Sequence, residues 1–235
     1  LPVSKQKPSR FARLRQSMRN LRRLSRDNSA VALVEFAFAA PLVLGMGMLG
    51  TETAYFSITH MQISQIAMQV ADNASRVGDS QLAAQVVTED DINSVLVGAE
   101  KLGARNGIFD NGRVIITSLQ QNTDGGQWIA WQRCRGAKNK PSEYGLEGTG
   151  ASGTDFAGMG DSTNPITASF GTAVIFVEVY YDYQPITPFE FFGATELVYE
   201  AAFNIRDVRD LSGLQQTDPV SPVAACNVFS ADRPT

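Results

Sequence analysis

Histidine and cysteine are scarce in this sequence of 235 residues, which has one histidine, His60, and two cysteines, Cys134 and Cys226. Protein zinc sites are built from clusters of these residue types, and a serine or cysteine nucleophile usually needs a histidine beside it. His60 has no such nucleophile context, and the cysteines are far apart. The acidic residues 89–91 suit the start of a helix better than a metal site. We therefore expect a protein that is not an enzyme and has no catalytic residues, metal or cofactor.

Basic residues are absent between Arg26 and Arg76. Before this gap, residues 1–27 carry nine lysines and arginines against one acid, whereas the rest of the chain carries 11 basic and 23 acidic side chains. A basic arm on an acidic body is typical of nucleic-acid binding, of contact with an anionic membrane, or of a targeting segment. The segment that follows the arm decides between these classes.

Residues 30–50 form a long apolar run, AVALVEFAFAAPLVLGMGMLG, in which Glu35 is the one charged residue. At about 1.5 Å per residue, a helix of this length spans the hydrocarbon core of a bilayer. Positive charge before the run predicts a cytoplasmic N-terminus. We assign residues 1–30 to a basic leader or cytoplasmic arm, 31–50 to a transmembrane helix and 51–235 to an extracytoplasmic domain. Membrane lipid, not nucleic acid, is the expected partner of the N-terminal region.

Other interpretations of the run compete with a membrane span. A buried core helix leaves the charge step across the run unexplained, and a cleaved secretory signal would need a better cleavage site than residues 50–52 provide. A mitochondrial presequence stays open, because apolar residues 11, 14, 18 and 21 of the arm have helical spacing. Residues 45–50 match a dinucleotide-binding GxGxxG but follow no strand, so small residues for close helix packing are the better interpretation.

Helical periodicity continues beyond the run and predicts one helix to about residue 77. Its apolar positions are Met61, Ile63, Ile66, Ala67, Val70, Ala71, Ala74 and Val77. Thr88 is a candidate N-cap for a second helix, with acids in the first turn and apolar residues at Ile92, Val95, Leu96 and Leu102. This helix is expected to end between residues 103 and 107.

After residue 112 the apolar residues no longer follow the helical spacing. Strands are predicted over 113–120, 127–135, 172–182 and 195–206. A Gly-rich loop is expected over 136–171. The predicted fold class is α+β: a long N-terminal helix with a transmembrane half and an amphipathic half, a short second helix, and a four-stranded antiparallel sheet packed on the long helix.

Residues 29–36 (SAVALVEF) resemble the processing site of type IV prepilins, in which a basic leader is followed by a small residue, four apolar residues and a glutamate. On that pattern Ala30 is the last leader residue, where glycine is commoner, and Val31 is the first mature residue. Glu35 then occupies the fifth mature position.

The resemblance narrows to the TadE family of pilin-like minor components of tight-adherence (Flp-type IVb) pili. It rests on residues 34–37 with Pro41, on 132–136, on 177–179 with 181–185, and on 203–211. It implies a pilin-like minor pilin or pilus-assembly protein of the inner membrane, with a periplasmic or extracellular domain that can join the pilus. The implied partners are a prepilin peptidase, which cuts between Ala30 and Val31, and other pilins or pilus-assembly proteins. Glu35, Phe36 and Pro41 are the implied assembly residues.

Two features of the domain each have two structural interpretations. An even number of cysteines in an exported domain predicts a Cys134–Cys226 disulfide that attaches the C-terminal tail to the second strand, rather than two free thiols. Five aromatic residues form either an exposed recognition surface or part of a core: Trp128, Trp131, Tyr180, Tyr181 and Tyr183.

The alternative function is a permanently anchored single-span envelope protein that binds a partner through an acidic β face. A membrane-tethered hydrolase is disfavoured, because the sequence lacks a catalytic constellation.

Overall fold

The structure is a computed structural model that describes residues 29–78, 84–188 and 191–235. The chain divides into two units, residues 1–51 and 52–235. The predicted basic arm up to residue 28 lies outside the described residues. In the first unit the described residues form the beginning of helix α2 (Ser29–Arg76), which continues into the second unit. The long helix is therefore confirmed, with an end one residue before the predicted one.

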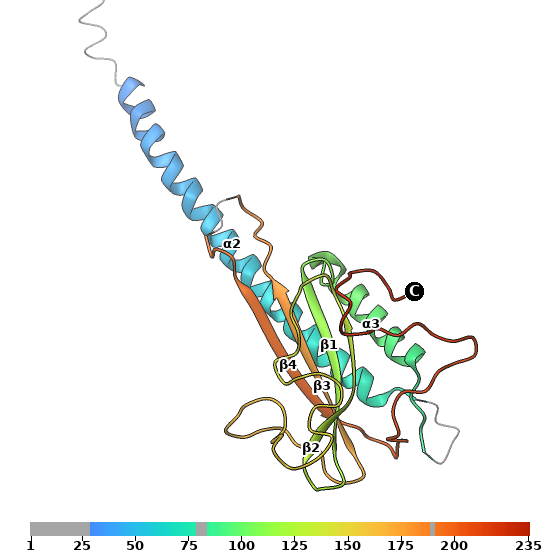
Figure 1. Ribbon diagram of the computed structural model, residues 1–235. Helices are drawn as coiled ribbons and strands as arrows, with labels where there is room; N and C mark the ends of the chain where they lie inside the picture. Colours follow the sequence, from blue (N-terminus) through green and yellow to red (C-terminus); the bar gives the residue numbers. More distant parts are fainter. Residues whose placement is uncertain (1–28, 79–83, 189–190) are drawn as a thin grey trace, which may run out of the picture. The chain divides into compact units, whose positions relative to one another are not determined.

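The second unit is an α+β domain, as the sequence predicts (Figure 1). Its remaining elements are α3 (Glu89–Gly103), the 3₁₀ turn η1 (Ala104–Asn106), β1 (Gly112–Gln121), β2 (Gln127–Arg135), β3 (Ala173–Asp182) and β4 (Glu196–Asn204). The strands form one antiparallel sheet in the order β2-β1-β3-β4. The predicted strand limits agree with the observed ones to within two residues.

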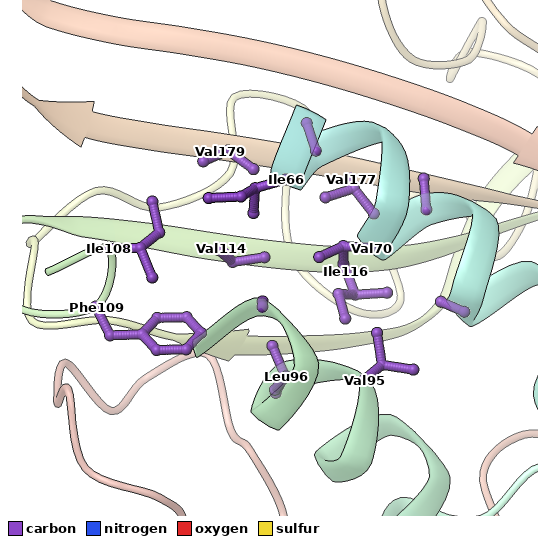
Figure 2. Close-up of a cluster of buried hydrophobic side chains, with 14 of the residues drawn as sticks. Ile66, Val70, Val95, Leu96, Ile108, Phe109, Val114, Ile116, Val177 and Val179 are labelled. Atoms are coloured by element: carbon purple, nitrogen blue, oxygen red, sulfur yellow. The ribbon is translucent and has the colours of Figure 1, made fainter. Parts of the chain in front are cut away.

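The C-terminal half of α2 places a stripe of side chains in the main core, where Ile63, Ile66 and Val70 are buried. The spacing of three and four residues explains this stripe, because such residues lie on one helix face. Figure 2 shows Ile66 and Val70 packed toward the β1 and β3 side chains of the same cluster. Met61 was predicted to belong to the stripe, but its side chain is 60% exposed. It lies two residues before Ile63 and so faces a different side of the helix.

Helix α3 begins with a reciprocal cap. The Asp91 amide donates to Thr88 Oγ1 at 3.2 Å, and the Thr88 amide donates to Asp91 Oδ2 at 2.9 Å. These bonds satisfy backbone donors that the first helical turn leaves without partners. Leu102, predicted as an apolar contact, is 47% exposed instead, while Gly103 occupies the buried position beside it.

Both faces of the sheet are covered, which explains why the central strands β1 and β3 are buried almost without alternation. One face packs on α2 and α3. On the other face, the predicted Gly-rich loop 136–171 contributes a second cluster in which Met159 and Ala168 pack with Phe176 of β3. The loop was correctly predicted, but its contribution to a core was not.

Four of the five aromatic residues that could have formed a recognition surface are buried: Trp131, Tyr180, Tyr181 and Tyr183. Tyr181 and Tyr183 belong to the main core, and Tyr180 packs on the opposite face of the sheet. The aromatic residues therefore serve the core, and the recognition-surface interpretation was wrong for these four.

Two glycines of α3 should respond oppositely to alanine. A Cβ at Gly98 would meet no atom within 4 Å, whereas a Cβ at Gly103 would lie 2.5 Å from Ile108 Cβ. We expect Gly98→Ala to raise the free energy of unfolding by roughly 0.5–1 kcal/mol, because alanine restricts the unfolded chain. Gly103→Ala should lower it by about 1–3 kcal/mol through overpacking. Urea unfolding of the full chain in detergent would measure both, and equal signs would contradict the structure.

Candidate functional site

The apolar segment of α2 in the first unit has no protein cover within the described chain. Side chains from residue 31 to 51 are exposed, apart from a half-buried Ala40. By length and composition, this is the one helix among the described residues that could cross a membrane. Leu33 and Phe38, for example, are 70% and 80% exposed. Exposed apolar surface on this scale points to a lipid or protein environment outside the chain.

The predicted processing and assembly residues all lie on this segment. Val31 is 56% and Phe36 68% exposed, and Glu35 is an exposed carboxylate among apolar neighbours. Val31 and Glu35 are four residues apart and so lie on one helix face. Ala30 is helical in its backbone, and its side chain is outside the described part.

Pro41 lies inside α2 rather than at its end. Proline has no amide hydrogen, so the Ala37 carbonyl lacks the helical donor that residue 41 would otherwise supply. Three glycines follow on the same segment, and a Cβ at Gly45, Gly47 or Gly50 would meet nothing within 4 Å. The segment thus combines a weakened turn with open positions at which another helix can approach closely.

Glu52, which sequence reasoning did not single out, begins the second unit as a fully buried residue of α2. Its Oε1 accepts a hydrogen bond from the Tyr183 hydroxyl at 2.5 Å and one from the Ile186 amide at 3.3 Å. Its Oε2 accepts one from the Thr187 amide at 2.9 Å. Glu52 therefore joins α2 to the segment after β3. The sequence feature that could have pointed to Glu52 is its position as the first charged residue after the apolar run.

The two cysteines form the predicted disulfide, Cys134–Cys226, which attaches the C-terminal tail to β2. Arg113 of β1 holds the same tail without a covalent bond: it donates to the Cys226 and Val228 carbonyls at 2.6 and 3.1 Å. Its guanidinium also stacks over Phe229. Burial lowers the pKa of Arg113 to about 10, so it stays charged at neutral pH.

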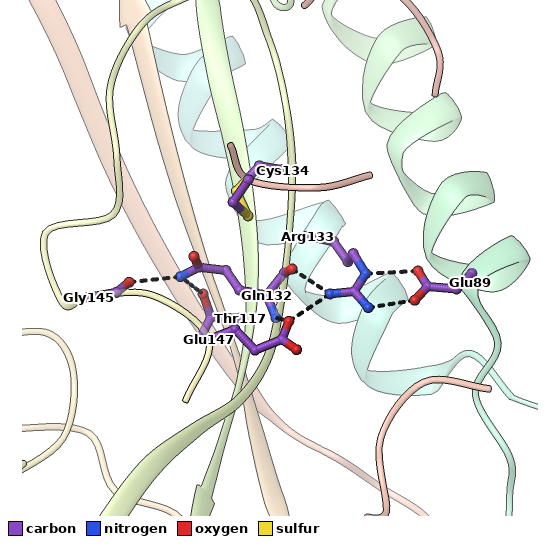
Figure 3. Close-up of polar contacts among 8 residues, drawn as sticks. Glu89, Thr117, Gln132, Arg133, Cys134, Gly145 and Glu147 are labelled. Atoms are coloured by element: carbon purple, nitrogen blue, oxygen red, sulfur yellow. Dashed lines mark hydrogen bonds and ion pairs between the residues drawn. A yellow bond between two sulfur atoms is a disulfide. The ribbon is translucent and has the colours of Figure 1, made fainter. Parts of the chain in front are cut away.

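Arg133 of β2 connects three parts of the domain. It makes a bidentate ion pair with Glu89 of α3, with N–O distances of 2.8 and 2.5 Å. It also donates a 2.8 Å hydrogen bond to the Glu147 carboxylate of the Gly-rich loop. Figure 3 shows this network beside Gln132, whose amide donates to Thr117 Oγ1 and to the Gly145 carbonyl. The acidic start of α3 was predicted from helix electrostatics, but the role of Glu89 in this pair was not.

Glu178 of β3 is a buried carboxylate beneath the Gly-rich loop. It accepts hydrogen bonds from the hydroxyls of Ser142 and Tyr180, both at 2.6 Å, and from the Glu143 amide at 3.1 Å. Burial outweighs these bonds and raises the pKa of Glu178 above its usual range. The acidic β face that the anchored-protein alternative requires is thus covered at this position.

This raised pKa makes the stability of the domain depend on pH. A carboxyl with a higher pKa in the folded than in the unfolded state stabilises below its unfolded pKa, and this contribution is lost as pH rises through the folded pKa. Relative to Glu178→Gln, which stays neutral, the wild-type chain should therefore lose stability as pH rises from about 4 toward 7. Urea unfolding of both proteins across this range checks the sign. If the wild-type chain instead becomes more stable relative to Glu178→Gln as pH rises, the prediction is contradicted.

The described residues include no group of three or more His, Cys, Asp or Glu side chains that could hold a metal ion. His60 lies against the domain's own aromatic side chains, with Nδ1 at 2.7 Å from the Tyr199 hydroxyl and its ring edge-on to Phe56. These contacts suit a structural histidine. In comparisons with known proteins, no family model, curated protein or solved structure matches this chain.

Proposed function

We propose that this chain is a minor pilin or pilus-assembly component of a tight-adherence type IV pilus, of the TadE type. Its N-terminal helix inserts into the inner membrane with the arm in the cytoplasm and the domain in the periplasm or outside the cell. A prepilin peptidase cuts between Ala30 and Val31, and the mature protein joins or primes the pilus together with other pilins.

One observation carries the proposal: an apolar helical segment that no other described part of the chain covers contains a single carboxylate, Glu35, one turn after Val31. An ionised carboxylate at membrane depth costs a few kcal/mol unless it has a partner. The α-amino group that cleavage creates on Val31 of a neighbouring subunit would donate a charge-assisted hydrogen bond to Glu35. The sheet that covers the amphipathic half of α2 supports a pilin-like architecture.

The mass of the membrane-extracted protein tests the processing step. When the full chain is co-expressed with an active prepilin peptidase, we expect a product that begins at Val31. A peptidase with an inactivated catalytic site should leave the full mass, and Ala30→Leu should block the cut with the active enzyme. Retention of residues 1–27 in the presence of active peptidase would instead support the permanently anchored envelope protein.

Removal of the carboxylate tests assembly separately. We expect Glu35→Ala to be inserted and cut normally but to be depleted about tenfold or more from sheared pili, because a charge-assisted hydrogen bond contributes more than 1.4 kcal/mol. Leu42→Ala is the matched control, since it shortens an exposed side chain of the same segment (67% exposed) without removing charge. If Glu35→Ala is found in pili at the control level, the assembly role of Glu35 is wrong.

A further inference from the structure

An apolar surface lies on the connection between β3 and β4, in the described residues 184–188 (QPITP) and 191–194 (FFGA), which carry no charge; Glu190 lies between these stretches, outside the described residues. Ile186 is 58%, Phe191 43% and Phe192 36% exposed. These side chains are bulky and lie close together in sequence, in a connection where polar residues are the rule. We refer to residues 184–188 and 191–194 as the apolar connection.

The apolar connection is held at both ends against one short stretch of α2. On the β3 side, the amides of Ile186 and Thr187 donate to the buried Glu52 carboxylate. On the β4 side, the Phe192 ring stacks on Phe56, with centroids 4.6 Å apart. In Figure 1 the orange segment that links β3 to β4 lies beside α2. The apolar connection is therefore fixed at the level of residues 52–56 of the helix.

This level lies at the end of the apolar run. Glu52 follows Gly50 by two residues, and the rise of a helix places it about 3 Å farther along the axis. If residues 31–50 cross the hydrocarbon core, the groups bound to Glu52 lie in the adjoining headgroup layer. Aromatic side chains are enriched in that layer, because it accommodates both their apolar rings and their polar edges.

From this placement we propose that the apolar connection is a second membrane contact, in which Ile186 and the neighbouring aromatic residues enter the lipid interface and seat the domain on the bilayer. The occupant of this surface is lipid, since its described residues carry no charge and are bound to Glu52, two residues beyond the apolar run on the same helix. The inference rests on the proposed insertion of α2. It adds that the domain is held near the membrane by two separate segments before any assembly.

Site-specific photo-crosslinking of the full chain in phosphatidylcholine vesicles tests this contact. The probe is p-benzoylphenylalanine, introduced at Ile186, where it leaves the Phe192–Phe56 stack intact. Leu44, inside the apolar run, is the positive control. Phe170 is the matched negative control: it is 83% exposed but precedes β3, so that a strand of 10 residues, roughly 30 Å, separates it from the apolar connection.

We expect lipid adducts at positions 44 and 186, and about tenfold less adduct at position 170, because lipid density falls sharply outside the interface. If position 44 gives lipid adducts but position 186 gives no more than position 170, the interfacial contact is wrong, while the proposed insertion of α2 is unaffected. Crosslinks from 186 to another protein chain would also overturn it. Absence of adduct at 44 would refute the insertion on which the inference rests.

A second measurement avoids the bulky probe. In vesicles with brominated acyl chains, the fluorescence of Ile186→Trp should be quenched more strongly than that of Phe170→Trp. Trp128 and Trp131 contribute the same background to both variants. Equal quenching of the two variants would overturn the proposal.

Discussion

Replacement of Cys226 by serine should lower the free energy of unfolding by about 4 kcal/mol, because the Cys134–Cys226 bridge closes a loop with a sequence separation of 92 residues. The bridge restricts the unfolded chain most when its loop is long, and this loop includes β3, β4 and the Gly-rich segment. For a domain of this size, the change corresponds to a fall in Tm of roughly 8–16 °C. Thermal unfolding of the oxidised full chain in detergent measures it.

Cys134→Ser and the double variant provide the controls. All three variants break the same bond, so their losses should be nearly equal rather than additive. The tail should remain docked in each, because Arg113 and Arg135 still bond to its carbonyl groups. A loss below about 1 kcal/mol would contradict the loop-closure account and would indicate that the noncovalent tail contacts suffice.

The elements of this fold could be predicted from the sequence because their signals are local. Helical spacing identified both helices, and runs of β-branched and aromatic residues next to turn residues identified all four strands within two residues. The strand order could not be predicted in the same way, since burial decides it. β1 and β3 are the central strands because their two faces are both apolar enough to be covered.

The missed features depend on contacts between residues far apart in the chain. Phe156, Met159 and Ile166 of the Gly-rich loop are isolated apolar residues among glycines and polar residues, so their second core could not be recognised. Glu89 and Glu52 were visible as acids near helix or span boundaries. Their functions became apparent only with their partners, Arg133 and Tyr183, which lie 44 and 131 residues away. A local pattern carries no information about such partners.

Among substitutions that leave the disulfide intact, the largest effect is expected at Glu89. Glu89→Gln leaves the Arg133 guanidinium, whose side chain is 12% exposed, with the more exposed Glu147 as its one anionic partner among the residues that the structure describes. Removal of one member of a buried ion pair typically costs 3–5 kcal/mol, because the other charge stays desolvated. We place this loss near 3 kcal/mol, since Glu147 and the Gln132 carbonyl remain bonded to Arg133. Urea unfolding of the full chain in detergent measures it.

A solvated ion pair supplies the comparison. Lys140 and Glu143 are 3.0 Å apart with side chains 30% and 54% exposed, so Glu143→Gln should cost less than about 1 kcal/mol. The double variant Arg133→Met/Glu89→Gln should be less destabilised than either Arg133→Met or Glu89→Gln alone, because no charge of the pair stays buried without its partner. A double variant that loses the sum of the single losses would show that the two residues act independently. The ion pair would then not be what joins α3 to β2.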